Sequence, residues 1–143
     1  MSATVDTNIL VYASDRRSSQ HTRAVELVTS LVSGRSLVYL LWPVIMGYLR
    51  IATNSRIFPE PLTPKEATAN IADLLRAPHI RTVSESADFF EAYSAISSRV
   101  SPRGKLVPDA HIVSLMHQHG IDTIWSGDRD FRKFDGIEVR NPF

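Results

Sequence analysis

Four aspartates stand where carboxylates could act together: Asp6, Asp109, Asp128 and Asp130. Carboxylates that crowd together repel one another and raise each other's pKa unless a cation neutralises them. The chain has no cysteine, so an all-oxygen ligand set is expected. Such ligands favour a hard divalent ion, Mg²⁺ or Mn²⁺. In an acidic cleft this kind of ion serves phosphoryl chemistry, because it stabilises the attacking water and the leaving oxygen of an in-line displacement.

Parallel strands are the elements that must bring these aspartates together. Asp6 follows a short β-prone run at residues 3–5, and the turn holding Asp128 and Asp130 follows another at residues 123–125. Asp109 falls in the first turn of a helix expected to start at Pro108, where the helix dipole favours a carboxylate. Right-handed crossovers put all carboxyl ends of parallel strands on one edge. Taken alone, Asp6 has a simpler interpretation as the cap of the following helix.

The other expected elements alternate between strands and helices. A capping box, Thr63 to Glu66, predicts a helix start, and apolar periodicity predicts the remaining helices. The pattern predicts an α/β fold with a central, mostly parallel β-sheet flanked by helices. After the first strand and a short helix, the expected ranges are a helix at 21–33, a strand at 36–41, helices at 43–53 and 63–76, a strand at 80–83, helices at 84–100 and 108–119, and strands at 123–125 and 137–139.

Length and composition restrict the class of protein. With 143 residues, 43% of them hydrophobic, the chain suits one domain spanning residues 1–143. The formal net charge of +1 gives no global signature of nucleic-acid binding, so any such site must be a local patch. The longest uncharged run, residues 36–49, contains Pro43 and is shorter than the ~20 residues of a membrane span. With no signal-peptide pattern at the N-terminus, we expect a soluble, cytoplasmic protein.

Four short motifs together resemble the PIN-domain family, and more narrowly the VapC-type toxins of bacterial toxin–antitoxin pairs. They are V-D-T-N-I-L-V-Y-A at residues 5–13, V-P-D-A-H-I at 107–112, S-G-D-R-D-F at 126–131 and the final N-P-F. The resemblance spans the whole chain. It implies a metal-dependent endoribonuclease, usually a homodimer, that a small VapB-type antitoxin holds inactive.

The resemblance also assigns roles to individual residues. Asp6, Asp109 and Asp128 match the metal-binding acids of the family, and Asp130 matches an additional acid of the last loop. Three polar residues, Thr7, Asn8 and Ser126, are expected to support the site.

One position departs from the family pattern. The helix after the second strand should carry a glutamate in a motif resembling Pro-x-x-x-Glu-x-Leu-Arg-x-x-Thr, and Gly47 stands in its place. A glycine inside a helix costs about 1 kcal/mol against alanine, so it needs a reason. One interpretation is close packing of the helix against a neighbour, and the other is a lost metal ligand that leaves the chain weakened or inactive.

Basic residues, histidines and two other classes of function also bear on this interpretation. Arg103, Lys105 and Arg129 belong to loops expected near the acidic cleft and could hold RNA phosphates, or form an ordinary mixed-charge surface. The five histidines are not expected to bind metal. A receiver-type phosphoacceptor domain would need an adjacent acid pair after its first strand and a lysine after its last, and the chain has neither. A noncatalytic PIN relative that binds RNA or protein remains the alternative because of Gly47.

Overall fold

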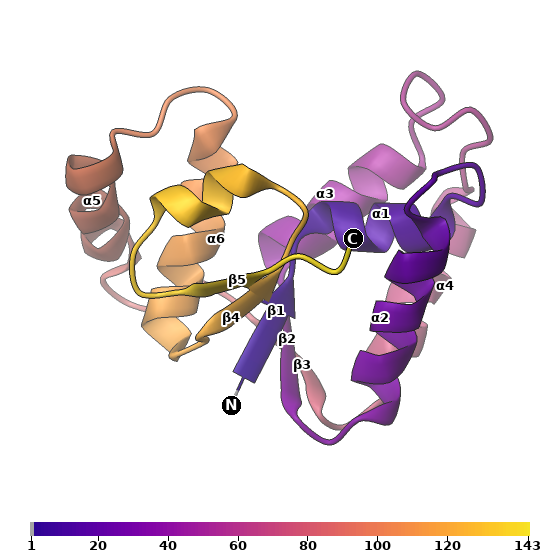
Figure 1. Ribbon diagram of the computed structural model, residues 1–143, viewed down its shortest axis with the longest axis horizontal. Helices are drawn as coiled ribbons and strands as arrows, with labels where there is room; N and C mark the ends of the chain where they lie inside the picture. Colours follow the sequence, from indigo (N-terminus) through magenta and orange to yellow (C-terminus); the bar gives the residue numbers. More distant parts are fainter. Residues whose placement is uncertain (1) are drawn as a thin grey trace.

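A five-stranded sheet forms the centre of the computed structural model, which describes residues 2–143 (Figure 1). The strand order is β3-β2-β1-β4-β5, and every neighbouring pair is parallel. The predicted sheet is therefore confirmed, and it is parallel throughout rather than mostly so. The strands are β1 (Ser2–Val5), β2 (Leu37–Leu41), β3 (Ile80–Val83), β4 (Thr123–Trp125) and β5 (Glu138–Arg140).

Helices cover both faces of this sheet. In Figure 1, α5 and α6 lie on one side of the strands, and α1, α2 and α4 lie on the other. Within residues 2–143, no helix has the length and apolar character that crossing a membrane requires. The helices are α1 (Thr7–Ser14), α2 (His21–Ser33), α3 (Trp42–Ala52), α4 (Pro64–Leu75), α5 (Phe89–Val100) and α6 (Leu106–His119), and a 3₁₀ turn covers Arg129–Lys133.

The core fixes the strand ends from which the aspartates project. Val5 and Ile124, on the adjacent strands β1 and β4, are fully buried, as are Leu41 on β2 and Val113 on α6. Helices packed on both faces of a parallel sheet stabilise it, because the apolar side chains of each face are then removed from water. Asp6 comes directly after Val5, so the buried end of β1 sets its backbone position.

Several predicted elements are confirmed in detail. Thr63 and Glu66 form the capping box of α4: the Glu66 backbone N–H donates to Thr63 Oγ1 at 3.1 Å, and the Thr63 N–H donates to Glu66 Oε1 at 3.0 Å. Gly120 ends α6 with a φ of +64°, a left-handed conformation that glycine adopts without strain. Local sequence therefore decides these two helix boundaries.

Two predicted helix starts are wrong. α5 begins at Phe89 rather than at residue 84, because the segment before it packs along α6 instead of coiling. Gln118 Oε1 accepts the Ser86 N–H at 3.3 Å, and His119 Nε2 is hydrogen-bonded to the Ser84 carbonyl at 2.7 Å. α6 begins at Leu106, two residues before Pro108. Proline is tolerated there because a first-turn N–H has no partner within its own helix.

The strand order creates a crevice at the carboxyl edge of the sheet. From β1 the chain builds outward through β2 and β3 in one direction, whereas β4 and β5 lie on the other side of β1. In open parallel sheets such a reversal between neighbouring strands separates the loops above them, and ligands bind there. Asp6 and Asp128 follow β1 and β4, so both acids belong to this switch point.

Candidate active site

Three of the four predicted aspartates meet directly. Carboxylate oxygens of Asp109, Asp128 and Asp130 all lie within 4.8 Å of one another. Asp109 arrives from the first turn of α6, and the other two come from the turn after β4. The fourth acid, Asp6, lines the same cavity as Asp109 and Asp128. The structure thus brings all four acids to one edge, with Asp6 outside the tightest group.

A chain of hydrogen bonds holds these acids in place. The buried Ser126 hydroxyl donates to Asp6 Oδ2 at 2.9 Å and accepts the Asp128 backbone N–H, also at 2.9 Å. The Asp130 N–H then donates to Asp128 Oδ1 at 2.9 Å. Ser126 therefore ties the turn after β4 to the carboxylate after β1.

Asp6 is more than a helix cap. It occupies the N-cap position of α1, but its side chain makes no capping hydrogen bond. Its side chain accepts from Ser126 instead, and the residue is only 8% exposed. Capping alone therefore does not explain Asp6, because the Ser126 hydroxyl holds its carboxylate at the site.

The cavity beside these acids has a volume of about 420 Å³. Thr7 and Asn8, two of the three predicted supporting residues, line it. Gly47 on α3 lines it as well, close to Thr7: a Cβ built on Gly47 would lie 3.2 Å from Thr7 Cγ2 and Oγ1. Both interpretations of Gly47 thus keep support, because the position faces the acids and is also closely packed.

Burial and crowding raise the pKa of the central carboxyls. Burial raises the pKa of Asp109 to about 7, and the negative charges of Asp6, Asp128 and Asp130 add to the increase. Burial also raises the pKa of Asp6, and the hydrogen bond from Ser126 opposes this effect. In the absence of a cation, Asp109 is therefore only partly ionised near neutral pH.

The predicted basic residues differ in their relation to the acids. Lys105 Nζ lies 3.9 Å from Asp130 Oδ2, and Lys133 Nζ lies 3.1 Å from Asp130 Oδ1. Arg103 and Arg129 are exposed. Among residues 2–143 they form no ion pair with a site acid. Asp130 is therefore the acid of the group that pairs directly with lysines, and the charge of Lys105 also opposes the rise in the pKa of Asp109.

Arg50 is a site residue that the sequence analysis did not single out. It lines the acidic cavity from α3, one turn after Gly47. The sequence contains a signal for Arg50, because it follows Gly47 by three residues and this spacing puts two positions on the same face of a helix. The five histidines each have a hydrogen-bond partner outside the group of four aspartates: Tyr12 O for His21, Leu31 O for His79, Glu85 for His111, Asp135 O for His117 and Ser84 O for His119.

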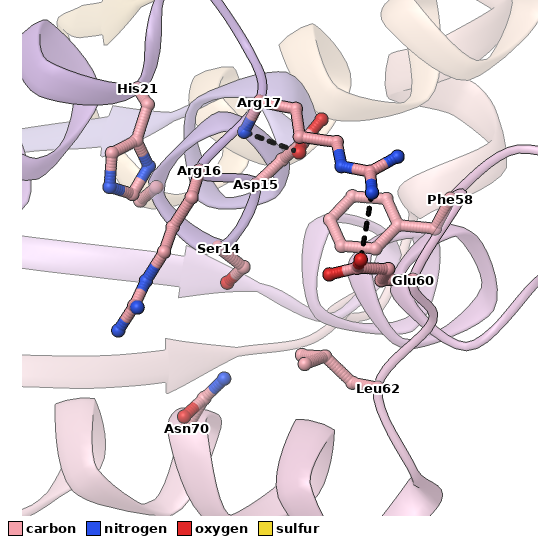
Figure 2. Close-up of a pocket in the computed structure, with 10 residues that line it drawn as sticks. Ser14, Asp15, Arg16, Arg17, His21, Phe58, Glu60, Leu62 and Asn70 are labelled. Carbon is pink, nitrogen blue, oxygen red and sulfur yellow. Dashed lines mark hydrogen bonds and ion pairs between the residues drawn. The ribbon is translucent and has the colours of Figure 1, made fainter.

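A larger cavity, of about 500 Å³, lies at the far end of α1 from Asp6 (Figure 2). Figure 2 shows two of its lining residues, Arg17 and Glu60, joined as an ion pair, with 2.7 Å between Arg17 Nη2 and Glu60 Oε1. None of the four aspartates is among its lining residues. Its opposite charges largely cancel, so size alone does not make it the catalytic site.

The raised pKa of Asp109 predicts a pH dependence of stability in the metal-free protein. In the unfolded chain this carboxyl has its ordinary pKa of 3.8, whereas in the fold its pKa is about 7. That contribution to stability is complete below the unfolded value and is lost as pH rises through the folded value. In EDTA, the melting temperature should therefore fall between about pH 4 and about pH 7. Asp109→Asn should flatten this fall; an equally steep fall in the variant would contradict the assignment.

Comparison with known proteins identifies the family of this chain. The sequence profile of the PIN domain matches residues 3–137. Ribonuclease VapC48 of Mycobacterium tuberculosis is 50% identical over 143 residues, which cover 100% of this chain and 99% of the relative. Ribonuclease VapC37 of the same species is 30% identical over 138 residues, covering 96% and 95%. The chain belongs to the PIN-domain family, as a member of its VapC group.

Solved structures give the same result for the fold. The chain resembles the crystal structure of VapC20 of Mycobacterium tuberculosis, described as a sarcin-ricin loop cleaving toxin, with a TM-score of 0.70, 20% identity and coverage of 96% and 98% of the two chains. It resembles a chain of VapBC2 from Rickettsia felis, bound to a DNA fragment from their promoter, with a TM-score of 0.68, 15% identity and coverage of 99% and 98%. These likenesses concern the fold.

Proposed function

We propose that this chain is the toxin of a type II toxin–antitoxin system and an endoribonuclease that hydrolyses RNA phosphodiester bonds with a divalent metal ion in the cytoplasm. The observation that carries the proposal is the group of carboxylates at the switch point of a PIN fold. Asp109, Asp128 and Asp130 lie within 4.8 Å of one another, and Asp6 adds its charge to theirs. The full-length relatives named as ribonucleases support the reaction type.

The donor set fits a hard divalent cation. It contains only oxygen atoms, which hard cations prefer. Burial and three neighbouring carboxylates raise the pKa of Asp109 to about 7, and a bound cation would relieve the repulsion among these carboxylates. Asp6, Asp109 and Asp128 would hold the ion. When bound, Mg²⁺ or Mn²⁺ supplies activation of the attacking water and stabilisation of charge on the phosphate.

The remaining site residues would position the acids and the RNA. Ser126 holds Asp6 and the Asp128 backbone in a fixed relation. Asp130, tied to two lysines, would orient the attacking water at the edge of the acid group. Phosphates flanking the cut would contact the basic residues of the cavity wall and nearby loops: Arg50, Arg103, Lys105 and Arg129.

The partner that fits this function is a VapB-type antitoxin. The acidic cavity carries more negative charge than its surroundings neutralise, so a basic side chain of a protein segment would complement it. The related fold in Rickettsia felis belongs to VapBC2. We expect the toxin itself to be a homodimer, as its family resemblance implies.

A noncatalytic PIN relative that binds RNA or a protein partner is the second candidate function. Gly47 is its one basis, since the family resemblance leads us to expect a glutamate at this position of the cavity wall; the relatives named as ribonucleases do not support it. RNA binding without cleavage, at any concentration of Mn²⁺, is the result that this alternative predicts.

Incubation of the purified chain with total cellular RNA tests the proposed function. We expect new RNA ends with Mn²⁺ and none with EDTA. Attack by water leaves no 2′,3′-cyclic phosphate, whereas attack by the ribose 2′-hydroxyl does, so end mapping also separates this activity from a metal-independent contaminant. RNA that stays intact with Mn²⁺, in a protein that circular dichroism shows to be folded, would contradict the enzyme.

A further inference from the structure

A second cavity, of about 340 Å³, lies immediately beside the acidic one. It shares Asn8 and Asp128 with the acidic cavity, so the two adjoin at a proposed metal ligand. Its other walls come from α1, the start of α2 and the last residues of the chain. The further lining residues are Tyr12, Gln20, Gly127, Asn141 and Phe143.

Two aromatic rings form one wall of this cavity. Tyr12 and Phe143 pack edge to face, with ring centroids 5.6 Å apart and an angle of 78° between the rings. Phe143 lies directly against the turn after β4, since a Cβ on Gly127 would come within 2.9 Å of its Cδ2. Asn141 Oδ1 accepts the Phe143 backbone N–H at 2.9 Å and fixes this position. These contacts place the aromatic wall in the same cavity lining as Asp128.

Neutral amides form the rest of the lining. Within residues 2–143, the carboxamides of Asn8 and Gln20 make no hydrogen bond, so their donors and acceptors are free to meet a ligand. Apart from Asp128, the lining holds no charged side chain. A phosphate would find no cation here. A planar, neutral group with donors and acceptors on its edge would find an aromatic wall for one face and carboxamides for its edge.

We propose that this cavity binds one nucleobase of the RNA, adjacent to the phosphate that is cut. Aromatic side chains stack on the faces of unpaired bases, and carboxamides pair with their donor and acceptor edges. Since the cavity adjoins the acids at Asp128, a base held here would place the neighbouring phosphate at the metal site. The inference rests on the proposed RNA cleavage and adds to it a source of sequence preference.

Binding of short fluorescein-labelled single-stranded RNAs tests the proposal, with Ca²⁺ replacing Mn²⁺ to slow hydrolysis. Tyr12→Leu should weaken binding at least about fivefold, as loss of a stacked base does. The effect should vanish on a matched RNA in which abasic ribose replaces every base. Tyr93→Leu serves as the control, because Tyr93 stacks on Phe90 of α5, away from the cavity.

Gln20→Ala is the second variant, since it removes a side chain without a hydrogen-bond partner and should leave the fold intact. Sequencing of cut ends should show a changed base preference at one position beside the cut. If both variants bind RNA as the unchanged chain does and cut it with the same preference, the base site is wrong while the proposed function stands. If they weaken only the complex with the antitoxin, the cavity serves the protein partner. A chain that neither binds nor cuts RNA contradicts the proposed function as well.

Discussion

Asp109→Asn is expected to reduce Mn²⁺-dependent RNA cleavage at least about a hundredfold, equal to roughly 2.7 kcal/mol of barrier. Asp109 is the acid whose pKa responds to all three of the others, so it stands at the centre of the group. Asparagine has nearly the shape of aspartate but carries no negative charge with which to bind a cation. Initial rates of cleavage of one labelled RNA, measured with saturating Mn²⁺, give the comparison.

The same variant separates loss of function from loss of fold. Removing one of several crowded charges should raise the melting temperature of the metal-free protein near neutral pH, while activity falls. Asp73→Asn is the matched control, because Asp73 is exposed on α4 and forms only a surface ion pair with Arg76. Activity of Asp109→Asn equal to that of the control would remove Asp109 from the catalytic group.

Gly47→Glu is expected to increase metal-dependent RNA cleavage at least about tenfold, or roughly 1.4 kcal/mol of barrier. A carboxylate on this face of α3 would enter the cavity that Asp6, Asp109 and Asp128 line. It would add an oxygen ligand and place the attacking water better. Expression of the variant without antitoxin should also be toxic to the cell.

Two control substitutions isolate the carboxylate at position 47. Gly47→Ala adds only the Cβ, which must displace the Thr7 side chain 3.2 Å away by a few tenths of an ångström. Gly47→Gln adds nearly the volume of glutamate without its charge. A gain with glutamate alone supports the lost ligand. If Gly47→Glu cuts RNA no faster than the unchanged chain while its circular dichroism is native, Gly47 is a packing residue.

The sequence predicted the fold well where one local signal sufficed. The capping box of Thr63 and Glu66, the stop at Gly120 and the apolar runs of the strands each depend on neighbouring residues, and all are confirmed. The start of α5 depends on Gln118 and His119, which lie more than thirty positions further along the chain. Their hydrogen bonds to Ser86 and Ser84 hold the segment before α5 outside the helix. No local pattern contains that information.

The candidate site was predictable in outline for the same reason. Strand ends and one helix start placed the four aspartates at one edge, and the structure brings them together there. The link through Ser126, the lysines beside Asp130 and the close approach of Gly47 to Thr7 are side-chain contacts between distant segments. The aromatic pair of Tyr12 and Phe143 spans nearly the whole chain. Such contacts follow from packing, which sequence spacing does not specify.

A crystal of this protein soaked in Mn²⁺ tests the central claim most directly, because manganese scatters anomalously and marks its own position. The account predicts an anomalous peak bounded by the carboxylates of Asp6, Asp109 and Asp128, and its loss in a crystal of Asp109→Asn. A map at saturating Mn²⁺ with no peak between these carboxylates, in crystals where other surface sites are occupied, would contradict the claim that these acids form a metal centre.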